Sequence, residues 1–173
     1  MNLGLDEETV LHRVEEALRL VGIEDLRDRV PHHLSGGEKK KVAIAGVIAM
    51  EPEVLLLDEP TAGLDPRGVR DLTAFINSLS RTYGMTVIFS THDVSLVPEV
   101  AEYVYVMNGG RFIAEGTVEE IFQRPEMLHS VRLDVPVIPK LIRSLQNKGI
   151  KIPMAYTYEE AEKAFLRTLE ERP

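Results

Sequence analysis

Cysteine and tryptophan are both absent from the 173 residues, and long apolar runs are absent as well. Without cysteine the chain has no disulfide framework and no zinc site built on thiolates, and a reducing compartment fits this composition. The apolar run Val42–Met50 is far shorter than the roughly 20 residues that a membrane-spanning helix needs. No basic stretch followed by an apolar one opens the chain, so no secretory leader is expected. We therefore expect a soluble protein that reaches a membrane only through a partner.

Positive charge is also scarce. Twenty lysine and arginine residues stand against 28 aspartate and glutamate residues, which gives a net charge of -8. A protein that binds nucleic acid through a broad surface needs an excess of basic residues. The one compact basic cluster, Lys39–Lys41, lies at a predicted helix start, where three lysines usually form a solvated face. Nucleic acid is therefore not an expected partner.

Helical and strand patterns alternate through the first half of the chain. The expected elements are helices over 6–21, 35–50 and 66–81 and strands over 54–57 and 85–90, the strands being apolar runs that we expect to be buried on both faces. The order of strand, helix and strand implies a parallel sheet with crossover helices. The predicted fold class is therefore α/β.

The second half begins with a short helix and a hairpin. The expected elements are a helix over 95–101, strands over 103–107 and 111–114 joined by a turn at Asn108–Gly110, and helices over 117–122, 139–148 and 158–171. We expect the hairpin to lie at the edge of the parallel sheet. Residues 135–139 contain two prolines and are interpreted as a linker.

Two acids, Asp58 and Glu59, directly follow the predicted strand 54–57. They therefore lie at the carboxyl edge of the sheet, where α/β proteins bind ligands. One carboxylate there can hold Mg²⁺, usually through water, because hard cations prefer oxygen ligands. The next carboxylate can polarise a water for attack on a terminal phosphate. Taken alone, two acids that simply cap a strand explain the pattern equally well.

Two further patterns have the same ambiguity. Ser35, Gly36 and Gly37 open a predicted helix, where free N–H groups and the helix dipole favour an anion. An ordinary serine cap followed by flexible glycines is the simpler interpretation. His92 follows the strand 85–90 and can hydrogen-bond a phosphate or orient the attacking water, although a lone loop histidine more often pairs locally.

Order and spacing resolve these ambiguities together. Four segments resemble the motifs of ABC-type ATPases. Leu34–Glu38 resembles the signature, Leu55–Pro60 the Walker B motif, Gly63–Asp65 the D-loop and Ser90–Asp93 the segment with the switch histidine. Less specific similarities indicate the ATPases of energy-coupling-factor importers, and those for cobalt or nickel are the most similar. They lie in the segments Asn2–Leu5, Asp28–His33, Val42–Gly46 and Pro139–Pro153.

The resemblance implies roles for the residues at the strand ends. Glu59 would be the general base, Asp58 the acid that holds magnesium through water, and His92 the contact to the γ-phosphate of ATP. ATP and Mg²⁺ are thus the implied cofactors. Asp65 would communicate across a dimer.

The resemblance also implies that Ser35–Gly37 touch the nucleotide held by a second subunit, because two ATPase domains of this family sandwich two nucleotides head to tail. Two residues depart from the family pattern. Glu38 stands where glutamine is common and adds negative charge near an anion site, and Lys41 replaces a frequent arginine.

By this resemblance the chain is the C-terminal portion of an ABC-type P-loop ATPase domain. The implied domains are a helical signature subdomain over 1–50, part of the ATPase core over 51–134, and a small C-terminal region over 135–173. The glycine-rich loop ending in Gly-Lys-Ser/Thr does not occur in the sequence. In the family this Walker A loop precedes the motifs found here.

The missing loop shapes the functional hypothesis. We expect that the isolated chain binds ATP very weakly and does not hydrolyse it. Either another polypeptide supplies the loop, or the chain is a truncated gene product. We also expect an open sheet edge, where the strand leading into the loop would pair.

The leading hypothesis is the ATP-hydrolysing subunit of an importer for a transition-metal ion such as cobalt or nickel, or for another micronutrient. Its partners would be a second ABC ATPase subunit, identical or different, and an integral membrane component, at the cytoplasmic face of the cell membrane. The alternative is a catalytically dead interaction or regulatory subunit that pairs with an intact ATPase. A soluble ABC protein of translation or DNA repair is disfavoured by the acidic charge, the single motif set and the lack of a long coiled coil.

Overall fold

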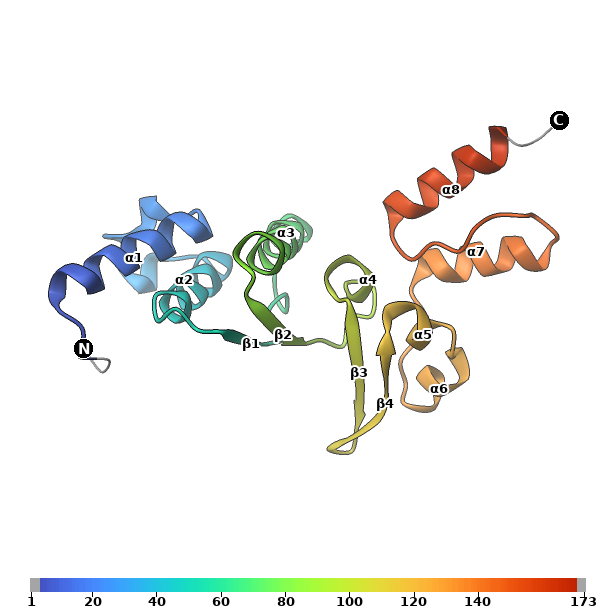
Figure 1. The fold of residues 1–173 in the computed structure, drawn as a ribbon, viewed down its shortest axis with the longest axis horizontal. Coiled ribbons are helices and arrows are strands. Elements are labelled where there is room, and N and C mark those ends of the chain that lie inside the picture. The colour runs from blue at the N-terminus through green and yellow to red at the C-terminus, as the bar shows by residue number, and fades with distance from the viewer. Residues whose placement is uncertain (1–3, 171–173) are drawn as a thin grey trace. The chain divides into compact units, whose positions relative to one another are not determined.

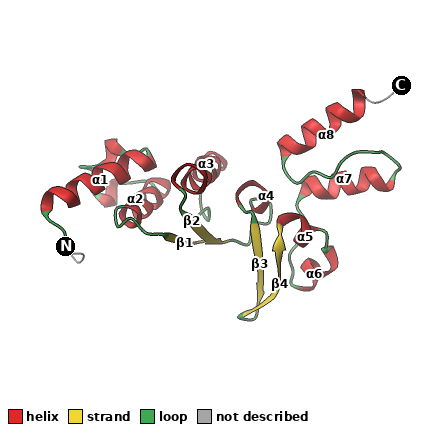
Figure 2. Cartoon of the chain, in the orientation of Figure 1, coloured by secondary structure: helices red, strands yellow, loops and turns green. Residues whose placement is uncertain are grey.

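The computed structural model describes residues 4–170, which form two compact units (Figure 1). The first unit extends to Thr91 and contains α1 (Glu7–Val21), the 3₁₀ turns η1 (Glu24–Leu26) and η2 (Pro31–His33), α2 (Gly36–Ile48), β1 (Val54–Asp58), α3 (Pro66–Tyr83) and β2 (Thr86–Ser90). The second unit begins at His92 and contains α4 (Val97–Val100), β3 (Tyr103–Asn108), β4 (Arg111–Thr117), α5 (Val118–Phe122), α6 (Pro125–Ser130), α7 (Val137–Asn147) and α8 (Tyr158–Glu170). Figure 2 shows this mixture of helices and strands, and the predicted α/β class is confirmed. Over residues 4–170, no helix has both the length and the apolar composition that a bilayer span requires.

The first two long helices begin and end where the sequence predicts. Asp6 caps α1 by accepting a hydrogen bond from the Thr9 N–H at 2.9 Å, and Gly22 ends the helix with a φ of 69°, a conformation that glycine adopts at little cost. Helix α2 packs against α1 and buries Ile44, Ala45 and Ile48. These two helices therefore form one packed pair within the first unit.

Strands β1 and β2 pair in parallel, from Val54 opposite Thr86 to Asp58 opposite Ser90, and α3 connects them. The predicted parallel pair with a crossover helix is therefore confirmed. Because β1 and β2 are the two strands of their sheet, each keeps an outer edge without a strand partner in the described chain. This agrees with the expected open edge.

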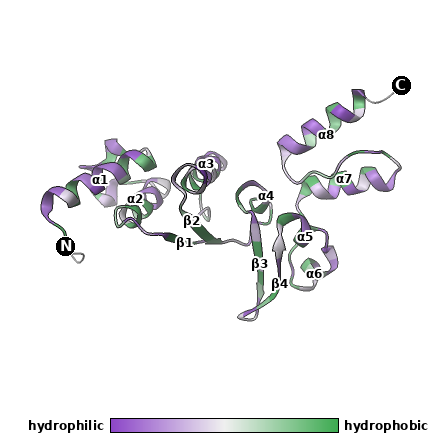
Figure 3. Cartoon of the chain, in the orientation of Figure 1, coloured by the Kyte–Doolittle hydropathy of each residue, from purple (hydrophilic) through white to green (hydrophobic). Residues whose placement is uncertain are grey.

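Only one face of this sheet is covered. Leu55 is 1% exposed, whereas Leu56 is 73% exposed and Ile88 is 53% exposed. The prediction that both strands are buried on both faces is therefore wrong. The physical reason is that a crossover helix covers the face on which it packs, and α3 packs on β2. The exposed residues of these strands include the apolar Val54, Leu56 and Ile88, and Figure 3 shows the green of hydrophobic residues in both strands.

Strands β3 and β4 form the predicted antiparallel hairpin, and Gly109 and Gly110 make its turn with φ values of 57° and 74°. Two successive positive φ values are typical of the two-residue turn that suits the twist of a hairpin. The hairpin is not part of the parallel sheet but a two-stranded sheet of its own, which corrects the predicted edge position. Val106 of β3 is buried and belongs to one apolar cluster with Ile121 and Phe122 of α5.

The interpretation of residues 135–139 as a linker is wrong. Val135 and Pro136 are buried, and α7 already begins at Val137, so that Pro139 lies buried in its first turn. Proline is tolerated there because the first-turn N–H groups have no partner within the helix. Val135 belongs to the core that also contains Leu128 of α6, a helix that the sequence reading missed. The proposed domain boundaries after residues 50 and 134 stay predictions.

A separate apolar core joins α7 to α8. It consists of Ile142, Ile152, Ala155, Ala161 and Ala164. The small alanines of α8 allow its backbone to approach α7 closely. The predicted amphipathic helix over 158–171 is therefore confirmed as α8 within the described residues.

An acidic side chain ties α6 to α7. Asp134 accepts hydrogen bonds from the Val135 N–H at 2.8 Å and from the ammonium of Lys140, and its Oδ1 lies 3.0 Å from His129 Nε2. The hydrogen bond from Lys140, followed by those from His129 and Val135, lowers the pKa of Asp134 from 3.8 to about 2. The ionised carboxylate is therefore favoured by folding.

We expect Asp134→Asn to destabilise the chain at neutral pH, with an effect that disappears in acid. Because the folded-state pKa is lowered, the carboxylate stabilises the fold above its ordinary pKa of 3.8 and loses this contribution as the pH falls towards 2. Urea denaturation followed by circular dichroism between pH 7 and pH 2 measures the difference. Glu126→Gln on α6 is the matched control. A constant difference between Asp134→Asn and the native chain across this range would contradict the assignment.

Candidate functional site

The acids predicted at the strand ends lie in one hydrogen-bonded cluster. Asp58 and Ser90 are opposite each other at the carboxyl ends of β1 and β2. The Ser90 hydroxyl donates to Asp58 Oδ1 at 2.5 Å and accepts the Glu59 N–H at 3.1 Å. One hydroxyl therefore fixes the side chain of the first acid and the backbone of the second.

Glu59 has a φ of 44°, in the left-handed region that residues with a side chain rarely adopt. Such a conformation costs on the order of 1–3 kcal/mol and persists where surrounding contacts hold it. Two such contacts are the Glu59 N–H bond to Ser90 and the Ala62 N–H, which donates to the Glu59 carbonyl at 3.1 Å. The chain therefore leaves β1 in a tight, strained turn at the predicted general base.

Lys40 of α2 reaches the same turn. Its ammonium donates to the carbonyl oxygens of Pro60 at 2.8 Å, Glu59 at 3.5 Å and Ala62. A lysine ammonium has three donors, and here each has a carbonyl oxygen within reach. The interpretation of the three lysines as a solvated face is therefore wrong for Lys40, which is partly buried.

The predicted anion-binding residues open α2 in a capping box. The Ser35 hydroxyl accepts the Glu38 N–H at 3.3 Å, and Glu38 Oε2 accepts the Ser35 N–H at 2.7 Å. The hydrogen bonds from Ser35 lower the pKa of Glu38, so its carboxylate is ionised at neutral pH. A negative charge therefore lies at the helix start, and the effect of Glu38 on an anion bound there stays a prediction.

The two glycines after Ser35 are not required by packing within the described residues. A Cβ added at Gly36 would meet no atom within 4 Å, and one at Gly37 would meet only Leu64 Cδ2, at an ordinary 3.7 Å. Glycine in a helix costs roughly 0.5–1 kcal/mol relative to alanine. The absence of a side chain at Gly36 leaves its backbone open to close approach from outside.

Asp65 has a local structural role. Its carboxylate caps α3 and accepts the Gly68 N–H at 2.7 Å. Asp65 and Gly37 also line one hollow of the first unit, between the signature segment and the start of α3. Its residues are Gly22, Ile23, Asp25, Leu26, Gly37, Glu38, Lys41, Asp65, Arg67, Gly68 and Asp71. The role of Asp65 across a dimer stays a prediction.

His92 is the first residue of the second unit and is exposed. Asp93 next to it orders the following turn, since its Oδ1 accepts the N–H of Ser95 at 3.0 Å and the hydroxyl of Ser95 at 2.5 Å. A contact from His92 to a terminal phosphate stays a prediction.

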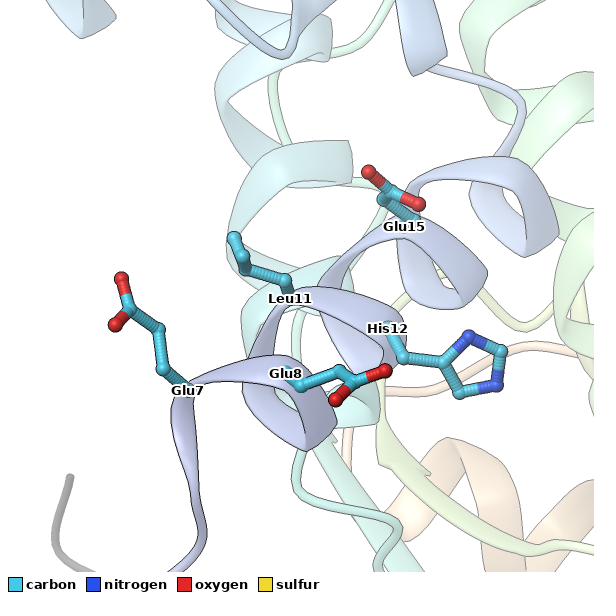
Figure 4. A pocket seen from close by; sticks show the side chains of 5 residues that line it. All are labelled: Glu7, Glu8, Leu11, His12 and Glu15. Atoms are coloured by element: carbon cyan, nitrogen blue, oxygen red, sulfur yellow. The ribbon is translucent and has the colours of Figure 1, made fainter.

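A second hollow lies along the first turns of α1 and is lined by Glu7, Glu8, Leu11, His12 and Glu15 (Figure 4). Three glutamates would repel a phosphate, so this hollow does not compete with the cluster at β1 as a nucleotide site. Within residues 4–170, no three acidic or histidine side chains are grouped to hold a metal ion. Asp58 nevertheless fits magnesium, which commonly binds through one carboxylate, several waters and substrate phosphates.

Comparison with known proteins connects this geometry to a family. Residues 3–62 match the family model described as ABC transporter. The energy-coupling factor transporter ATP-binding protein EcfA of Methanoculleus marisnigri is 70% identical over 166 residues, which are 96% of this chain and 60% of that protein. EcfA1 of Methanospirillum hungatei JF-1 is also 70% identical, with the same shares covered. The chain belongs to the energy-coupling factor ABC ATPase family.

Solved structures agree with this assignment. The structure of cbiO1 from Clostridium perfringens, part of the ABC transporter complex cbiONQ, is 43% identical with a TM-score of 0.66, over 84% of this chain and 57% of that one. The chain spans about 60% of the length of EcfA and EcfA1, the two relatives named above. The family model covers Ser35–Gly37, Asp58 and Glu59 but ends before Asp65 and His92.

Two residues of the cluster at the end of β1 were not predicted individually. The sequence indicates Ser90 only as the first residue of the segment Ser90–Asp93, although its position at the end of the strand that pairs with β1 predicts a contact to Asp58. Lys40 has no such signal, because the contact from α2 to the turn after β1 depends on tertiary packing. Both residues bind main-chain or carboxylate groups of the predicted site.

We expect Ser90→Ala to lower the free energy of unfolding by about 1 kcal/mol, the usual net contribution of such hydrogen bonds. Ser90→Thr keeps the hydroxyl at the end of β2, where the residue is exposed, and should lose less than half as much. Urea denaturation of the three proteins, followed by circular dichroism, measures both differences. If Ser90→Ala is as stable as the native chain, the hydroxyl does not hold the cluster.

Proposed function

We propose that this chain provides the hydrolytic and cross-subunit parts of an ATP-driven, energy-coupling-factor importer. The observation that carries the proposal is the cluster of Asp58, Ser90 and Glu59 at the carboxyl ends of two parallel strands. A carboxylate fixed by a hydroxyl, followed by a second carboxylate, is suited to a magnesium–phosphate substrate. The family assignment supports the same chemistry.

The residues of the chain would divide the work. Asp58 would hold magnesium through water, with Ser90 fixing the orientation of its carboxylate. Glu59 would accept the proton of the attacking water, and His92 would hydrogen-bond the γ-phosphate. When bound, magnesium neutralises charge on the phosphates. The strained turn after β1 would keep the Glu59 backbone in one position through the reaction.

The signature segment would serve a different nucleotide. The backbone at Gly36 is open to approach and lies at the start of a 13-residue helix, whose N–H groups and dipole favour a phosphate. Nothing in the described part of the chain requires glycine there. We infer that Ser35, Gly36 and Gly37 complete the site of a second ABC ATPase subunit, with Asp65 beside them in the dimer contact.

The remaining partners follow from the relatives. Proteins named energy-coupling factor transporter ATP-binding protein suggest that an integral membrane component receives the energy, at the cytoplasmic face of the cell membrane. The proposed cargo is a transition-metal ion such as cobalt or nickel, or another micronutrient, on the basis of the sequence resemblance. The Walker A loop would come from residues outside this chain, either in a longer form of the same protein or in another polypeptide, because the 173 residues contain none.

The first experiment tests nucleotide binding by the chain alone. We expect calorimetric titration with Mg-ATP to show no micromolar binding, for the native chain and for Glu59→Gln, since the main phosphate-binding loop is absent. Addition of a polypeptide with a Walker A loop should restore binding to both proteins and turnover to the native chain only. Micromolar binding by the chain alone would contradict the dependence on that polypeptide. Equal turnover by Glu59→Gln would exclude Glu59 as the base.

The second experiment separates the fold from the nucleotide contact at the signature segment. Gly36→Ala and Gly46→Ala place the same methyl group on α2, and neither would meet an atom within 4 Å. We expect both to keep or raise stability, Gly46→Ala by roughly 0.5–1 kcal/mol. Only Gly36→Ala should abolish the ATP turnover of the assembled pair, because its methyl group occupies the space of the partner's phosphate. Turnover that survives Gly36→Ala would refute the contact in trans.

A further inference from the structure

We propose that Lys40 is a positioning residue that locks the Glu59 turn to the signature helix. The inference rests on the proposed function, since it assigns to Lys40 the control of the same site. It concerns a lysine that the sequence placed in a solvated basic cluster and to which no functional role was assigned. Lys40 touches no substrate in this proposal and acts through the backbone of residues 59–62.

The contacts of one face of α2 carry the argument. Gly37 and Lys40 are three residues apart, so they lie on the same side of the helix. The position of a Cβ on Gly37 is 3.7 Å from Leu64, while the Lys40 ammonium binds the carbonyl oxygens of Pro60, Glu59 and Ala62. Two independent observations therefore put this side of α2 on the segment from Glu59 to Leu64.

The chemistry of the contact is specific for lysine. Carbonyl oxygens only accept hydrogen bonds, and three of them converge on one point charge with three donors. Arginine has its donors in a planar fork, which suits a carboxylate better than three converging carbonyls. Lys39 next in sequence is exposed, and Lys41 lines the hollow near Asp65 instead. The three lysines therefore have different roles.

The turn that Lys40 holds is the strained one. Glu59 has a φ of 44°, and a conformation of this kind needs contacts to maintain it. Lys40 thus fixes the backbone of the proposed general base to the helix whose first residues face the partner's nucleotide. A shift of either element would be transmitted to the other, so the two ATP sites of a dimer would be coupled through this ammonium.

Hydrogen exchange on the full chain tests the lock directly. The Ala62 N–H donates to the Glu59 carbonyl and the Leu64 N–H donates to the Thr61 carbonyl, both at 3.1 Å. We expect Lys40→Met to raise exchange in residues 59–65 at least tenfold and to leave α1 unchanged. Lys39→Met, on the exposed neighbour, is the matched control. Unchanged exchange in Lys40→Met would overturn the proposal.

Chemical rescue separates the ammonium from the packing of its alkyl chain. Because the sequence has no cysteine, Lys40→Cys introduces a single thiol. Alkylation of this thiol with bromoethylamine before refolding rebuilds an ammonium at the length of lysine, and iodoacetamide gives a neutral side chain as the control. We expect slow exchange in residues 59–65 to return only with the ammonium. Equal exchange after both treatments would show that the charge does not hold the turn.

Turnover in the assembly with a Walker A polypeptide tests the consequence for the site. Lys40→Met should lower kcat at least tenfold and leave the KM for ATP within twofold, because it displaces Glu59 and not the phosphate-binding loop. Lys39→Met should match the native chain. An unchanged kcat would refute positioning of Glu59 by Lys40. An assembly that is inactive even with the native chain would refute the proposed function, while the exchange and rescue measurements would still decide the role of Lys40.

Discussion

The parallel pairing of β1 with β2 is the constraint on which the described site depends. The register that sets Asp58 opposite Ser90 brings a hydroxyl from one strand to a carboxylate from the other. A shift of this register by one residue would turn each side chain to the opposite face of the sheet and separate the two groups. The crossover helix α3 joins the two strands and keeps them parallel, so the site and the topology have the same origin.

Several residues serve the fold and the proposed chemistry at once. Asp65 caps α3, and Ser35 caps α2 in a box with Glu38. A helix cap explains each of these residues without any ligand. Gly36 is different, because no contact in the described chain explains the lack of a side chain there. A Cβ added at Gly46 in the middle of α2 would also meet no atom within 4 Å, so what distinguishes Gly36 is its place at the start of the helix, where free N–H groups favour an anion.

Local sequence patterns predicted most elements, because their causes lie within a few residues. The cap at Asp6, the end of α1 at Gly22 and the glycine pair of the hairpin are examples. The errors concern long-range packing. The exposure of Leu56 depends on which elements cover the sheet. The contact of Lys40 depends on how α2 lies against the turn after β1, which is distant in sequence. The prolines at residues 136 and 139 suggested a linker. Proline is also tolerated at the start of a helix, and both of these residues lie at the start of α7.

The candidate site shows the same difference between features that depend on local sequence and features that depend on long-range packing. The identities of Asp58 and Glu59 were evident from a strand followed by two acids, whereas the hydroxyl between them required the strand register. The strained backbone of Glu59 has no sequence signal, since glutamate rarely adopts a positive φ. Asp65 was named by resemblance, and the structure adds a local role for it as the cap of α3.

The uncovered apolar face of the β1–β2 sheet also determines how the purified chain would behave in solution. Leu56 and Ile88 present to water an apolar surface of the kind by which proteins associate. Two copies of the chain could bury this face against each other, so the state of the purified chain would depend on its concentration.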